Sequence, residues 1–172
     1  MAGMAHNDSR ENPSYNPEGF CDLPLSRFPM GAMNAMALDH LIRWAAEGAV
    51  PPRADRIVMD YDEENDGSPL SLDHHGNAQG GVRNTYVDVP VAKLGIPNRV
   101  ADPKYGDMNQ LFCAIAGYVE PMTGKALKEH YGSAEMYRQK VEARLAELMS
   151  QGWFLPEYET QVRHDMEQVE IW

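Results

Sequence analysis

Residues 31–48 read Gly-Ala-Met-Asn-Ala-Met-Ala-Leu-Asp-His-Leu-Ile-Arg-Trp-Ala-Ala-Glu-Gly and form the most regular stretch of the sequence. Apolar side chains recur in it every three or four residues, which is the pattern of one face of an α-helix. They are Met33, Met36, Ala37, Leu41, Trp44 and Ala45. Gly48 and the pair Pro51-Pro52 then end the pattern, because glycine accepts the left-handed cap and proline cannot continue a helix. We therefore predict a helix over residues 31–48.

The C-terminal part of the chain predicts three further helices. Thr123 and Ser133 are suitable N-caps for a short helix ending near residue 131 and for a longer helix ending near residue 152. Pro156 suits the first turn of a final amphipathic helix. We expect a helical cluster at the C-terminal end.

The remaining segments predict short strands joined by irregular chain. Residues 57–59 and 87–91 are predicted as strands, the second at a sheet edge because it contains a proline. The run 111–119 is the most apolar of the sequence and is typical of a buried strand. Residues 1–30 and 95–110 are predicted to be irregular. Taken alone, this order of elements indicates an α+β arrangement.

The charge balance bears on the class of partner. Lysine and arginine number 15 and aspartate and glutamate 26, which gives a formal net charge of −11. Nucleic-acid binding is not expected, because it needs clustered cations. No run of 18 apolar residues occurs, and Met1–Asp8 has neither the basic nor the apolar region of a signal peptide, so we expect no membrane partner. As given, the chain would stay in the cytoplasm, but a longer parent protein could be exported, so its localisation is left open.

The two cysteines, Cys21 and Cys113, stand 92 positions apart without a Cys-x-x-Cys motif. This spacing argues against a zinc ribbon and against a disulfide scaffold. We predict two reduced, half-buried thiols.

An acidic loop partly matches a calcium-binding loop. Asp62, Glu64 and Asp66 alternate, Gly67 follows, and Asp73 stands at the twelfth position, where a glutamate would be expected. The flanking sequence is not helical and no second copy exists. A solvated acidic loop is the favoured interpretation.

Asp73, His74 and His75 are residue types that ligate zinc or iron. Adjacent histidines on an extended chain point to opposite faces, so at most one of them is expected to serve a given site. The histidines on predicted helices are not spaced in the sequence like the ligands of a metal motif such as His-Glu-x-x-His; these are His40, His130 and His164. Structural or solvated histidines are favoured, and we expect no metal and no cofactor.

Glycine-rich residues 76–83 resemble a phosphate-binding loop only superficially, because the lysine and the hydroxyl residue of a P-loop are missing. A turn that needs positive φ angles is the better interpretation, and Arg83 could anchor it to a carboxylate. No serine stands in a Gly-x-Ser-x-Gly nucleophile elbow.

Short sequence strings in a fairly specific order carry a resemblance that covers nearly the whole chain. They are Ala2–Asp8, Ala37–Trp44, Gly48, Pro51–Ala54, Gly76–Arg83, Val87–Pro90, Gly117–Pro121, Leu127, Tyr131–Ala134, Tyr137 and Gly152–Pro156. With these strings the chain resembles the C-terminal part of a family of large α/β-hydrolase domain proteins.

The resemblance implies the fold class α/β, here as a fragment of an α/β-hydrolase fold that is α+β in isolation. Residues 1–52 would be the catalytic-histidine loop and C-terminal helix of the hydrolase core, and residues 53–172 an appended region. In this family the triad order is Ser, then Asp or Glu, then His. His6 would therefore be the general base of a carboxylic-ester hydrolase acting on a small-molecule ester. The nucleophile elbow and the acidic residue would lie upstream of Met1, so the chain alone would be inactive.

Two alternatives stay open. The chain could be a non-enzymatic acidic α+β interaction module that binds a partner through Trp44, Trp153 and Phe154. A metal-dependent enzyme using Asp73, His74 or His75 is the less favoured alternative. If a covering sheet is missing, Leu41 and Trp44 should be exposed, and the chain should self-associate through this apolar surface.

Overall fold

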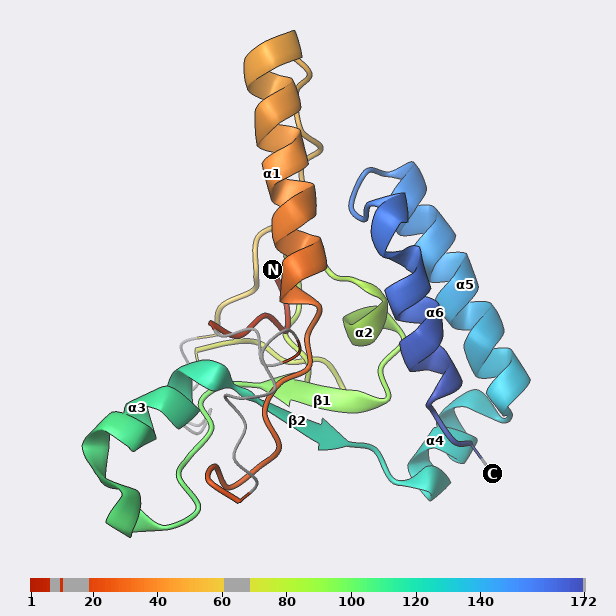
Figure 1. Cartoon of the computed structure of the whole chain (residues 1–172). Helices are drawn as coiled ribbons and strands as arrows, with labels where there is room; N and C mark the ends of the chain where they lie inside the picture. Colours follow the sequence, from red (N-terminus) through yellow and green to blue (C-terminus); the bar gives the residue numbers. More distant parts are fainter. Residues whose placement is uncertain (7–9, 11–18, 61–68, 172) are drawn as a thin grey trace.

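The computed structural model describes residues 1–6, 10, 19–60 and 69–171. Figure 1 shows the helix α1 (Met30–Glu47) projecting from a body that contains a small central sheet. The helices α5 (Ala134–Ser150) and α6 (Glu159–Glu167) lie side by side on one flank of the body. Helix α3 (Gly106–Ala116) lies on the opposite flank.

Helix α1 confirms the prediction for residues 31–48. Its first turns bury Ala32, Met33 and Met36 in the core. Gly48 ends it in the left-handed conformation, with φ of 70°, which glycine adopts without a steric penalty.

The outer part of α1 is covered only in part by the described residues, through the contact of His40 with Gly152 and Trp153. Trp44 is 55% exposed, and Leu38, Leu41 and Ile42 are each 56% exposed. The expected exposure of Leu41 and Trp44 is therefore found.

The three C-terminal helices are also confirmed. The hydroxyl of Thr123 accepts a hydrogen bond from the Ala126 amide at the start of α4 (Gly124–Tyr131). The hydroxyl of Ser133 accepts one from the Met136 amide at the start of α5. The 3₁₀ turn η3 (Pro156–Tyr158) leads into α6. Capping residues and apolar spacing were sufficient signals for α4 and α5, and apolar spacing with Pro156 for α6.

Two predicted strands in the middle of the chain are wrong or displaced. Residues 87–91 contain the end of a short helix, α2 (Thr85–Asp88), because the Asn84 side chain accepts from the Tyr86 amide and caps it. The strand β1 follows at Ala92–Gly95. Residues 57–59 form no regular strand; Met59 makes an isolated bridge with Leu70, and the Val58 backbone is hydrogen-bonded to Gln79 and Ser71.

The run 111–119 is mostly helical instead of a buried strand. Helix α3 occupies Gly106–Ala116, and so also takes the end of the stretch predicted as irregular, 95–110. A 3₁₀ turn, η2 (Pro103–Tyr105), precedes it. Cys113 and Ala116 are buried three residues apart on one face while Leu111 is exposed, which is a helical pattern. The strand β2 (Tyr118–Pro121) follows and pairs antiparallel with β1, from Ala92 opposite Pro121 to Gly95 opposite Tyr118.

Cys21 and Cys113 form a disulfide, so the prediction of two reduced thiols is wrong. Their Cα atoms lie 5.7 Å apart although 92 positions separate them in the sequence. Spacing along the chain could not reveal this proximity, because it arises only when the segment before α1 folds against α3. The bond fastens these two parts of the chain together.

One buried apolar cluster connects the two ends of the chain. Ala2, Phe28 and Met33 belong to the same cluster as Leu145 and Phe154. The boundary expected between residues 52 and 53 stays a prediction.

The described residues contain helices and one two-stranded antiparallel sheet, which confirms an α+β arrangement for the chain taken alone. Within those residues, no helix has the length and apolar content needed to cross a membrane.

Candidate functional site

The N-terminal loop that carries His6 is fixed through its backbone. The amide of Ala2 donates to the carbonyl oxygen of Val82 at 3.0 Å, and the amide of His6 donates to that of Ile115 at 2.9 Å. Ala2 and Ala5 are buried, whereas His6 is exposed. The imidazole is thus presented to the outside on a tethered loop.

Within the described part of the chain, no serine hydroxyl or carboxylate is hydrogen-bonded to the His6 imidazole. A hollow of about 950 Å³ lies beside the same loop and is lined by Met1–Met4. Leu23, Ile57, Leu70 and Leu94 give it much of its apolar character.

The turn at residues 73–77 is built around the Asp73 side chain. Asp73 Oδ1 accepts hydrogen bonds from the amides of His75 and Asn77, both at 2.9 Å. Gly76 completes the turn with φ of 78°, which confirms that the glycine-rich stretch needs positive φ. The buried Asn77 side chain accepts from the Leu94 amide at 2.8 Å and so fastens the turn to β1.

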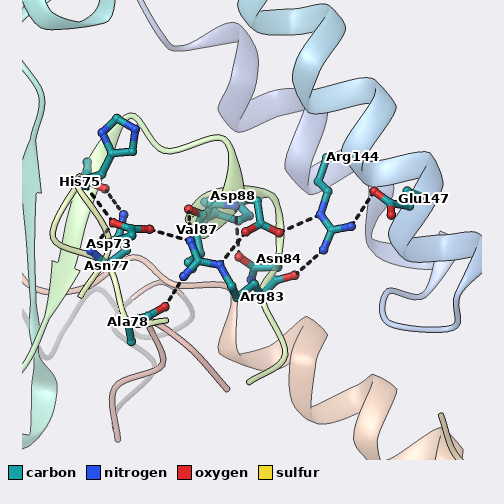
Figure 2. A network of polar contacts seen from close by, with 12 residues as sticks. Asp73, His75, Asn77, Ala78, Arg83, Asn84, Val87, Asp88, Arg144 and Glu147 are labelled. Atoms are coloured by element: carbon teal, nitrogen blue, oxygen red, sulfur yellow. Dashed lines mark hydrogen bonds and ion pairs between the residues drawn. The ribbon is translucent and has the colours of Figure 1, made fainter. Parts of the chain in front are cut away.

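Arg83 anchors this turn to α2 by two ion pairs (Figure 2). Its guanidinium donates to Asp73 Oδ2 at 2.7 Å and to Asp88 Oδ1 at 2.6 Å. It also donates to the carbonyl oxygens of Ala78 and Val87. The expected anchoring of Arg83 to a carboxylate is found.

Helix α5 completes the network from the other side. Arg144 Nε donates to Asp88 Oδ2 at 2.8 Å, and its Nη1 donates to Glu147 at 2.7 Å (Figure 2). Sequence reasoning missed Asp88 and Arg144, because nothing in the local pattern relates α5 to α2. These ion pairs connect the turn, α2 and α5 and fix their positions relative to one another.

The structure brings His74, His75 and His130 together. The rings of His74 and His75 have centroids 3.8 Å apart, and the ring of His130 lies 4.4 Å from that of His75. The potential ligand atoms of all three lie within 4.8 Å of one another. His130 comes from the last turn of α4 and also lines a cavity of about 310 Å³ together with Lys140 and Arg144.

Two expectations about the histidines are corrected. His74 and His75 do not point to opposite faces, because they stand in a turn and not on an extended strand. His130 joins them although its position in the sequence shows no ligand spacing. The only sequence signal was the imidazole itself, since the approach of α4 to the turn is a tertiary contact.

The Asp73 carboxylate accepts hydrogen bonds from Arg83 and from two turn amides, and it is not part of the group formed by His74, His75 and His130. Burial raises the pKa of Asp73, but hydrogen bonds from Arg83 and from the two turn amides outweigh it and lower the pKa overall. Burial lowers the pKa of His75, and the neighbouring imidazoles lower it further. Burial, His74 and Lys140 lower the pKa of His130 in the same way.

The other candidate residues have simpler roles. His40 is structural, since its Nε2 lies 2.7 Å from the Gly152 carbonyl oxygen. His164 is exposed on α6. The calcium-loop candidates other than Asp73 lie outside the described residues; these are Asp62, Glu64, Asp66 and Gly67.

A family model described as "Alpha/beta hydrolase domain" matches residues 1–164. No curated protein and no solved structure gives a significant match.

Proposed function

Because the chain belongs to the alpha/beta hydrolase domain family, we propose that it is the C-terminal part of a serine-dependent carboxylic-ester hydrolase whose triad histidine is His6. The observation that carries the proposal is the His6 loop: its backbone is fixed to α3 through Ile115, and its side chain is exposed. An imidazole that must reach a serine on another segment needs this combination of a fixed backbone and an accessible ring.

The proposed chemistry is acyl transfer. The His6 imidazole takes the proton of a serine hydroxyl as its oxygen attacks the ester carbonyl, and returns that proton to the departing alcohol. A water molecule then attacks the acyl-enzyme with the same imidazole as base. The serine and the acidic residue are assigned to a segment upstream of Met1, because no serine here stands in a nucleophile elbow. The apolar hollow next to the His6 loop suits the acyl part of the substrate.

The DNA upstream of the Met1 codon tests this assignment. An open reading frame that extends back to a Gly-x-Ser-x-Gly following a predicted strand supports it. A stop codon close upstream, together with a ribosome-binding site before Met1, contradicts it unless a separate chain brings the serine.

The exposed face of α1 favours a second candidate, an acidic α+β module that binds a partner or a second copy of itself. Leu38, Leu41, Ile42 and Trp44 are each more than half exposed. Phe154 is excluded as a contact residue because it is 2% exposed and packs in the core. A sharp thermal unfolding transition favours the module, whereas poor cooperativity of unfolding favours the hydrolase part.

A further inference from the structure

We propose that His74, His75 and His130 form a binding site for a divalent transition-metal ion, for which Zn²⁺ is the probe. The three imidazoles come from two separate elements, the turn at residues 73–77 and the last turn of α4. The proposal is independent of His6 and of the hydrolase assignment.

The geometry is close to that of a three-histidine site. A Zn–N bond of about 2.0–2.1 Å places the ligand atoms of a tetrahedral site about 3.4 Å apart. The potential ligand atoms here lie within 4.8 Å of one another, so the widest pair has to close by at most about 1.4 Å. His74 and His130 are exposed, and their side chains can turn by this amount without disturbing the core.

The backbone around the cluster is already fixed. The Asp73 carboxylate holds the turn through the amides of His75 and Asn77, and Arg83 holds Asp73. On the other side, the buried hydroxyl of Tyr131 donates to the Pro90 carbonyl oxygen at 2.7 Å, next to His130. A metal ion would thus meet ligands that need only side-chain adjustment.

The ligand set selects the class of ion. Imidazole nitrogens suit zinc, copper, nickel and iron, whereas calcium and magnesium prefer oxygen ligands. Asp73, the nearest carboxylate in the sequence, is occupied by Arg83. Three imidazoles leave a fourth position for water. The bound ion would link the turn to α4, and a ligand that binds only the folded state raises its stability.

The test is titration of the whole chain, free of any histidine tag, with Zn²⁺ in a calorimeter. The expected result is one equivalent of Zn²⁺ per chain and an affinity that falls more than about tenfold in His130→Asn. His164→Asn, which changes an exposed histidine outside the cluster, is the matched control and should bind as the unchanged protein does. The unfolding temperature should rise on addition of Zn²⁺ in the unchanged protein and in His164→Asn, and much less in His130→Asn.

His74→Asn is a second variant, at an exposed turn position, in case His130→Asn fails to fold, and circular dichroism of each metal-free variant reports folding. It should also weaken binding more than about tenfold. Visible absorption of the Co²⁺-loaded protein should show the intense bands of a four- or five-coordinate ion. Absence of stoichiometric Zn²⁺ binding, full affinity in a folded cluster variant, or an equal loss in His164→Asn would overturn the proposal.

Discussion

Replacing Arg83 with methionine is expected to lower the free energy of unfolding by about 3 kcal/mol. Its side chain is 19% exposed, and those of its partners Asp73 and Asp88 are 16% and 23% exposed. Removing one partner costs about 3–5 kcal/mol for a fully buried pair and about 0–1 kcal/mol for an exposed pair. Asp88 keeps Arg144 as a second cation, whereas Asp73 keeps only amide donors. The expected loss therefore falls near the lower end of the buried range.

Urea denaturation followed by far-ultraviolet circular dichroism measures this loss. Arg163→Met is the matched control, because Arg163 pairs with Glu142 and Glu159 on the exposed surface and should matter much less. Arg83→Lys should recover only part of the stability, since an ammonium cannot reproduce the two-pronged contact. Equal losses in Arg83→Met and Arg163→Met would refute the view that Arg83 anchors the turn.

Three other changes follow from the structure. The fold lowers the pKa of Asp73, so the stabilising contribution of its carboxylate is present above the unfolded pKa of about 3.9 and is lost as the pH falls through the folded value. The difference in free energy of unfolding between the unchanged protein and Asp73→Asn should therefore become smaller in acid. A difference that becomes larger in acid contradicts the assigned role of Arg83. Reduction of the disulfide between Cys21 and Cys113 should cost up to about 4.6 kcal/mol from the entropy of a loop this long; urea midpoints that do not move with reductant would show that the bond does not constrain the unfolded chain. Trp44→Glu should reduce self-association of the chain in light scattering, and a monodisperse monomer before the change would remove the basis for that expectation.

The helices were predictable where local signals agreed. In α1, α4 and α5, apolar spacing and a capping residue pointed to the same element, and in α6 apolar spacing agreed with Pro156 just before it. The middle of the chain was harder, because an apolar run such as 111–119 fits a buried strand and a buried helix equally well by composition. Its contact with Cys21 through the disulfide of Cys113 lies far away in the sequence, so no local pattern could show how this segment packs.

In the candidate sites too, features set by local sequence were predictable and features set by tertiary contacts were not. That Arg83 anchors the glycine-rich turn to a carboxylate was predictable, but not which carboxylates: Asp73 and Asp88 stand ten and five residues away from it in the sequence. The meeting of His130 with His74 and His75 was not predictable, because it depends on how α4 packs against the turn. The catalytic role of His6 rests on the family and on the exposure of its ring, and stays a proposal.

Ester hydrolysis by a polypeptide in which this chain is joined to the proposed upstream serine tests the central claim most directly. With a p-nitrophenyl ester as substrate, His6→Ala is expected to lower kcat by at least about a thousandfold, because the serine loses its base. His164→Ala, on the surface of α6, should leave the rate unchanged. A His6→Ala rate within a few-fold of the unchanged protein would contradict the assignment of His6 as the triad histidine.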